Sequence, residues 1–167
     1  PEVEIAAVEL ERHIKLVSLS LVLSRQKQGD GGKGQYFNDV ERAIETHGMQ
    51  GSTFEGDLET LRAKFYNMRK DYQRSVDHAQ KALQIFETRT DDFTSVYPFI
   101  ARRTKGDSLK AMDKPILAAL EYQHVMQNLE GEIPSDHPFV ETAFKSWLTT
   151  RSGLEEAGRL DEAEQAG

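Results

Sequence analysis

The 167-residue chain contains no cysteine, which excludes disulfide bonds, a thiol nucleophile and cysteine-ligated zinc. It has no run of about eighteen consecutive apolar residues, so no transmembrane helix and no membrane insertion are expected. Basic side chains are in the minority, with 21 Lys and Arg against 28 Asp and Glu. The net charge of −7 argues against nucleic acid as the main partner. The first residues carry no signal region, so a cytoplasmic location is slightly favoured.

The residue patterns of catalytic and metal sites are also missing. The 5 histidines are scattered, and no pair has the i, i+4 spacing with Glu that a metalloprotease helix needs. The glycine-rich stretch 29–34 does not match a phosphate-binding loop, because Lys27 and Gly34 stand where that motif needs Gly and Ser or Thr. It does not match a calcium loop either. We therefore expect no enzyme activity, no metal site and no cofactor, and interpret residues 28–34 as a linker.

Apolar residues at helical spacing occur along the whole chain. One example begins at Tyr72 and continues through Val76, Ala79, Leu83 and Phe86, in steps of 4, 3, 4 and 3. This spacing predicts seven helices and the start of an eighth at 158–163. Pro98 is expected in the first turn of a helix from about residue 94, and Asp113 is expected to cap the next one. The predicted class is all-α, with helices in antiparallel pairs because most connections are short.

Small and large residues recur at a fixed interval within these helices. Ala63, Tyr66, Ser75 and Ala82 stand at offsets 0, 3, 12 and 19, and Gly106, Leu109, Ala118 and Val125 repeat them 43 residues later. Arg151, Leu154 and Ala163 repeat the first three offsets after another 45 residues. Small residues allow paired helices to approach closely. We therefore expect Ala82 and Ala118 to be buried where two helices meet.

This pattern resembles the tetratricopeptide repeat, which places a small residue and then an aromatic in its first helix and small residues in its second. The matching segments are 63–66 with 71–75 and 81–83, then 106–109 with 118–122, then Trp147, Leu154 and 157–164. The period of 43 to 45 residues exceeds the usual ~34 of this repeat, as in the kinesin light chain type. The resemblance implies an antiparallel helix-pair solenoid, wound as a right-handed superhelix. It covers 54–167 well and 5–48 poorly.

One domain is expected over residues 1–167. It would consist of a degenerate helix pair at 1–50 and repeat-like units at 54–90, 94–130 and 138–167, the last of them incomplete. Only four residues follow Ala163, whereas a stack normally ends in a full capping helix. The pattern therefore predicts that the natural chain continues past Gly167, or that this end packs against a neighbour.

The resemblance also implies a function, because repeats of this kind hold protein segments in a concave groove lined by the first helix of each pair. The expected role is a non-catalytic scaffold whose partner is a protein or peptide. The alternative is an oligomerisation, sensor or regulatory module of a larger protein, in which the first helix pairs with a second copy. A homo-oligomer is therefore open at this point.

The expected groove lies in the basic middle of the chain. Residues 59–110 carry 11 Lys and Arg against 7 Asp and Glu, while 1–58 and 111–167 are acidic. The groove positions of the family fall on Lys64, Asn67, Met68, Arg103 and Lys110. The basic members are expected to hold a carboxylate or an acidic segment, and Asn67 to donate a hydrogen bond to a peptide backbone. The alternative is that these are ordinary solvated charges.

Overall fold

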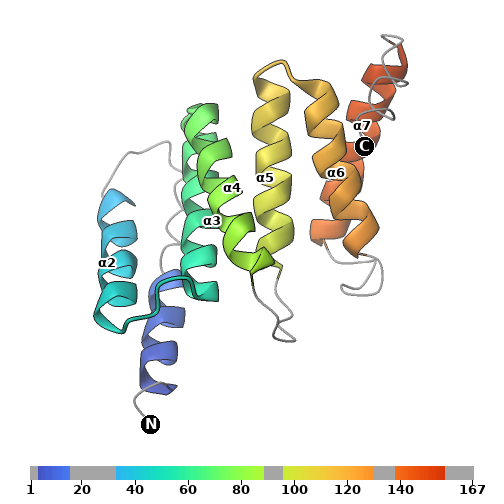
Figure 1. The fold of residues 1–167 in the computed structure, drawn as a ribbon. Coiled ribbons are helices and arrows are strands. Elements are labelled where there is room, and N and C mark those ends of the chain that lie inside the picture. Colours follow the sequence, from blue (N-terminus) through green and yellow to red (C-terminus); the bar gives the residue numbers. More distant parts are fainter. Residues whose placement is uncertain (1–3, 16–32, 89–95, 130–137, 157–167) are drawn as a thin grey trace.

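The computed structural model describes residues 4–15, 33–88, 96–129 and 138–156, and all regular secondary structure in these ranges is helical. A helix at residues 4–15 is followed by α2 (Lys33–Thr46), α3 (Thr53–Met68), α4 (Tyr72–Glu87), α5 (Tyr97–Ala111), α6 (Pro115–Leu129) and α7 (Pro138–Glu156). The helices stand in a row, with 4–15 and α2 on one side and α7 on the other (Figure 1). The predicted all-α class is confirmed for this part of the chain.

Several helix ends follow the signals expected from the sequence, and one does not. Pro98 lies in the first turn of α5, where its missing N–H leaves no helical hydrogen bond unmade. The carboxylate of Asp71 caps α4 by accepting a hydrogen bond from the backbone N–H of Arg74. The expectation for Asp113 is wrong, because α6 begins at Pro115 and Asp113 belongs to the turn that closes α5.

The glycine-rich stretch before α2 is partly helical. The sequence predicts a linker at 28–34, but α2 begins at Lys33, so the last two residues of this stretch are helical. A helix tolerates glycine in its first turn more easily than in its middle, because the first N–H groups have no helical partner. The rest of that stretch and the predicted helix at 158–163 lie outside the described residues.

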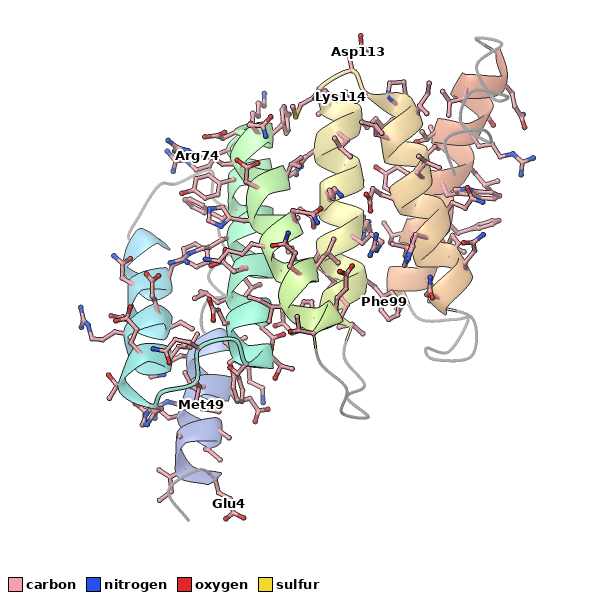
Figure 2. The ribbon with its side chains drawn as sticks, in the orientation of Figure 1. Glu4, Met49, Arg74, Phe99, Asp113 and Lys114 are labelled. Atoms are coloured by element: carbon pink, nitrogen blue, oxygen red, sulfur yellow. The ribbon has the colours of Figure 1, made fainter. Side chains whose placement is uncertain are left out.

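The helices α2, α3 and α5 end in the same kind of turn. The residue after each cap has a positive φ, at Gly48 (62°), Lys70 (61°) and Asp113 (58°). The next N–H then reaches back to a helix carbonyl over 2.9 Å, from Met49 to Ile44, from Asp71 to Tyr66 and from Lys114 to Leu109. The turn after α3 folds α4 back along α3, and the turn after α5 folds α6 back along α5. Figure 2 labels Arg74 beside the first of these two turns and Asp113 and Lys114 in the second, at the same end of the molecule.

The core is a series of clusters between neighbouring helices. The first cluster joins residues 4–15, α2 and α3 and contains Leu10, Ile14, Phe37, Val40, Ala43, Ile44, Leu58 and Leu61. Further along the row, Leu109, Ala118 and Tyr122 form a cluster against which the half-buried Trp147 of α7 packs. Ala82 and Ala118 are completely buried, which confirms the expectation that both lie where helices meet.

The 43-residue interval also relates the packing of α3 and α4 to that of α5 and α6. Ala63 and Ala79 are both completely buried in the first pair. The equivalent positions of the second pair hold Gly106 and Tyr122, and the tyrosine ring lies directly against the glycine. Volume removed on one helix is thus replaced by volume added on the other, which keeps the pair closely packed. In addition, α3 contacts α5, so the first helices of the two pairs lie against each other.

Candidate binding surface on α3 and α5

Two of the predicted groove residues lie on the side of α3 that meets α5. The side-chain amide of Asn67 reaches α5, where its Nδ2 donates a hydrogen bond to the Oγ of Ser108 over 2.9 Å. Lys64 lies one helical turn earlier on α3 and is half-buried. The structure therefore brings α3 and α5 together at Asn67, as a groove lined by first helices requires. We give the name α3–α5 face to the four predicted positions on these two helices, which are Lys64, Asn67, Arg103 and Lys110.

The two basic residues from α5 differ in their surroundings. The Nε of Arg103 lies 3.9 Å from Asp107 Oδ2, and the same carboxylate accepts a hydrogen bond from the Tyr122 hydroxyl. Burial and this contact with Asp107 raise the pKa of Tyr122 well above its ordinary value. Lys110 is exposed in the last turn of α5. The charge of Arg103 is thus partly balanced within the protein, and Lys110 is the more accessible cation.

Met68, the fifth predicted groove residue, has an apolar contact within the protein. It is half-buried and packs against the first core cluster, on the side of α3 that meets α2 and residues 4–15. An apolar side chain is stabilised in such surroundings because its contacts there remove it from water. Met68 therefore helps to hold the N-terminal helices in place.

A buried chain of hydrogen bonds lies beneath Asn67 and was not anticipated. The Ser108 hydroxyl donates to the Ser75 Oγ over 2.8 Å, and the Ser75 hydroxyl donates to the backbone oxygen of Ala63 over 2.7 Å. Both serines are completely buried. Ser75 was recognised from the sequence only as a small residue of the repeat. Ser108 gave no signal, because the equivalent position 43 residues earlier is the aromatic Phe65.

A buried carboxylate contacts two basic side chains and a histidine inside the first helix pair. Glu59 is almost completely buried and lies 2.8 Å from Arg62, 2.5 Å from His78 and 3.7 Å from Lys81. Burial by itself would raise the pKa of Glu59, but the hydrogen bond from His78 and the three positive charges outweigh it and lower this pKa. The His78 ring also stacks on Tyr66, with centroids 5.2 Å apart. Together these contacts form an ion-pair network that joins α3 to α4.

The second helix pair contains a matching cluster in which the acid lies on the second helix of the pair and not on the first. Glu121 of α6 lies 3.1 Å from Arg102 and 2.8 Å from Lys105, both on α5, and Arg102 also lies 3.9 Å from Glu87 at the end of α4. Lys105 also donates a hydrogen bond to the side-chain oxygen of Gln80 on α4. The cluster therefore links three helices. Comparing charges across the 43-residue interval would have revealed both clusters from the sequence.

Asp57 is a second buried acid, and its surroundings differ from those of Glu59. Only 8% of Asp57 is exposed, and its Oδ1 has no hydrogen-bond partner among the described residues. Burial raises the pKa of Asp57 to about 7. Burial and the nearby charge of Asp57 also raise the pKa of Tyr97, at the start of α5, to about 12. This carboxyl changes its charge near neutral pH within a packed interface.

Within the described ranges, no group of three or more His, Asp or Glu side chains is arranged to hold a metal ion. None of the helices in the same ranges is both long enough and apolar enough to cross a membrane. No protein-family model, curated protein or solved structure matches the chain.

Proposed function

We propose that the chain is a non-catalytic scaffold of the tetratricopeptide type, which binds a protein or peptide segment along the α3–α5 face. In this proposal the helix pairs stack as a right-handed solenoid and present their first helices on one side. The binding role is supported by the resemblance of the repeat pattern to this family.

The observation that carries the proposal is the repetition of packing at 43 residues. Alanine positions of the first helix pair are matched by Gly106 and Tyr122 in the second, and the cluster around Glu59 is matched by the one around Glu121. Structural repetition of this kind is the basis of a solenoid. The contact between α3 and α5 supports it further, because successive first helices must touch in such a stack.

The chemistry of the face favours an acidic partner. Lys64 and Lys110 supply positive charge from two helices, and Asn67 lies between these helices with an amide that can bond to a peptide backbone. Residues 59–110 carry more basic than acidic side chains, whereas the rest of the chain is acidic. A negatively charged ligand is therefore attracted to this middle section more than to the two ends. The proposed ligand class is therefore a peptide segment rich in Asp or Glu.

The test uses acetylated hexaglutamate as the probe and maps its binding by NMR on ¹⁵N-labelled protein. We expect shifts at Lys64, Asn67 and Lys110, and weaker binding as salt rises because exposed charges are screened. The variant Lys64→Glu with Lys110→Glu should abolish binding. Arg103 is left unchanged, because reversing its charge would place a carboxylate against Asp107.

A matched control reverses two charges on another helix. Lys145 and Arg151 of α7 are exposed and form i, i+4 pairs with Glu141 and Glu155. The variant Lys145→Glu with Arg151→Glu should bind hexaglutamate as the wild type does. Equal loss in both double variants would show that only net charge matters, and shifts confined to other helices would place the binding site elsewhere. Either result rejects the α3–α5 face.

The second candidate function is self-association through residues 4–15. Ile5 and Val8 are one turn apart on this helix and are 66% and 67% exposed, which is unusual for large aliphatic side chains. Sedimentation equilibrium distinguishes the two functions. A dimer that Ile5→Lys with Val8→Lys converts to a monomer would favour the oligomerisation role, whereas a monomeric wild type would leave it without support.

A further inference from the structure

The buried hydrogen bonds beneath Asn67 have a fixed direction. The series of hydrogen bonds begins at the backbone oxygen of Ala63, which can accept a hydrogen bond but cannot donate one. The single hydroxyl proton of Ser75 therefore points to this oxygen, over 2.7 Å. Ser75 must then accept from Ser108 over 2.8 Å, and this bond uses the single hydroxyl proton of Ser108. With both protons used, Ser108 has only acceptor capacity left for a third partner.

That direction decides how the Asn67 amide is oriented. An Asn side chain can be turned by 180° with little change in shape, and only its hydrogen bonds distinguish the two orientations. Because Ser108 can only accept, the Nδ2 of Asn67 must face it, which is the arrangement found at 2.9 Å. The Oδ1 atom is then the other branch of the amide. Asn67 is half-buried, and its Nδ2 is the branch of the amide that bonds to Ser108.

We propose that Ser75 and Ser108 are positioning residues that hold the Asn67 amide with its oxygen toward the partner, where it accepts a backbone N–H of an extended peptide. The remaining Nδ2 proton can donate to a carbonyl of the same peptide, so one side chain contacts both backbone groups. This pairing requires an extended segment, because the backbone groups of a helical ligand are already bonded within the helix. The peptide part of the inference rests on the proposed function, whereas the orientation of the amide does not.

The orientation is tested without any ligand, by hydrogen exchange of side-chain amides in ¹⁵N-labelled protein. One Nδ2 proton of Asn67 should exchange at least about tenfold more slowly than those of Asn38, which is exposed on α2. Ser108→Ala removes the acceptor and should abolish this protection. Ser75→Ala does not touch the amide, but it frees the Ser108 hydroxyl to donate and allows the amide to turn. It should therefore reduce the protection as well.

The controls separate this effect from general loosening of the fold. Ser146→Ala changes a half-buried serine on α7 and should leave the exchange of Asn67 unchanged. If Ser75→Ala does not fold, Ser75→Cys provides a side chain of similar size with a much weaker donor. A wild-type Asn67 that exchanges as fast as Asn38 overturns the proposal. So does a folded Ser75→Ala or Ser75→Cys protein with full protection at Asn67.

The peptide part is tested with acetylated hexaglutamate and with the same peptide methylated at every backbone nitrogen. Methylation removes the N–H that Asn67 would accept from, and it should weaken binding by about tenfold, the effect of one lost hydrogen bond. Ser75→Ala should weaken binding of the unmethylated peptide by about fivefold. In this variant the difference in affinity between the two peptides should be smaller than in the wild type. Equal binding of both peptides to the wild type would show that Asn67 does not accept a hydrogen bond from the peptide backbone. If neither peptide binds while Asn67 is protected, the proposed function fails and the positioning role stands.

Discussion

Glu59 of α3 and Arg102 of α5 occupy the same place in successive helix pairs, 43 residues apart, and carry opposite charges. Glu59 is surrounded by cations from α3 and α4, and Arg102 lies 3.1 Å from Glu121 of α6. In each pair an ion-pair cluster stands where apolar packing would otherwise join the two helices. The low proportion of hydrophobic residues, 38%, is consistent with this replacement. Reversed signs also discourage the wrong helices from pairing, because like charges would then meet.

The first prediction concerns the removal of the buried acid. Glu59→Gln leaves His78 and Arg62 without their buried partner, and it should lower the free energy of unfolding by about 3 kcal/mol. Urea denaturation followed by circular dichroism measures this change. Glu41 also pairs with Arg62 but is half-exposed, so Glu41→Gln should cost less than about 1 kcal/mol. Equal costs for the two variants would show that burial of Glu59 contributes nothing.

The second prediction concerns the close contact of α5 and α6. A Cβ at Gly106 would lie 2.7 Å from Cε1 of Tyr122, and the Tyr122 ring is buried and tied to Asp107 by its hydroxyl. Gly106→Ala should therefore destabilise the protein by about 1–3 kcal/mol, although alanine is the better helix former. Gly153 on α7 has nothing within 4 Å of its Cβ position. Gly153→Ala should thus raise the melting temperature, and a rise in both variants would mean that Tyr122 can move aside.

Helix positions and close-packed small residues could be predicted from the sequence because they depend on local spacing. The starts of α3 and α6 follow from apolar periodicity together with Ser52 before α3 and Pro115 at the start of α6. Asp113 was misjudged because the same residue type suits a helix cap and a left-handed turn, and only the chain geometry decides between them.

The hydrogen bonds that join α3, α4 and α5 could not be predicted in the same way. The bond from Asn67 to Ser108 joins residues 41 positions apart, and it depends on how α3 and α5 meet. Met68 was assigned to the groove by its place in the repeat. The apolar surface offered by residues 4–15 and α2 determines its actual position. Tertiary contacts of this kind have no counterpart in local periodicity.

The third prediction concerns the turn after α3. Lys70 has a φ of 61°, a conformation that costs a non-glycine residue about 1 kcal/mol. Lys70→Gly should remove this strain and stabilise the protein by up to that amount, because Lys70 is exposed and the turn is otherwise unchanged. Gly48 provides the reverse experiment at the equivalent turn after α2. It has free space around its Cβ position, so any loss of stability in Gly48→Ala comes from the backbone alone.

The last prediction concerns pH. The pKa of Asp57 rises from 3.8 to about 7 on folding, so between these values the folded state binds more protons at this carboxyl than the unfolded state does. Its contribution to stability is complete below about pH 4 and is lost as the pH rises toward 7. Asp57→Asn cannot ionise, and near pH 8 it should be more stable than the wild type by about 2–4 kcal/mol, with the difference vanishing near pH 4. Asp77→Asn on the exposed side of α4 is the control and should change stability by less than about 0.5 kcal/mol at either pH. Urea titrations of the three proteins at both pH values measure these differences. A wild type that gains stability relative to Asp57→Asn on going from pH 4 to pH 8 would show that Asp57 is not held in an environment that opposes its charge.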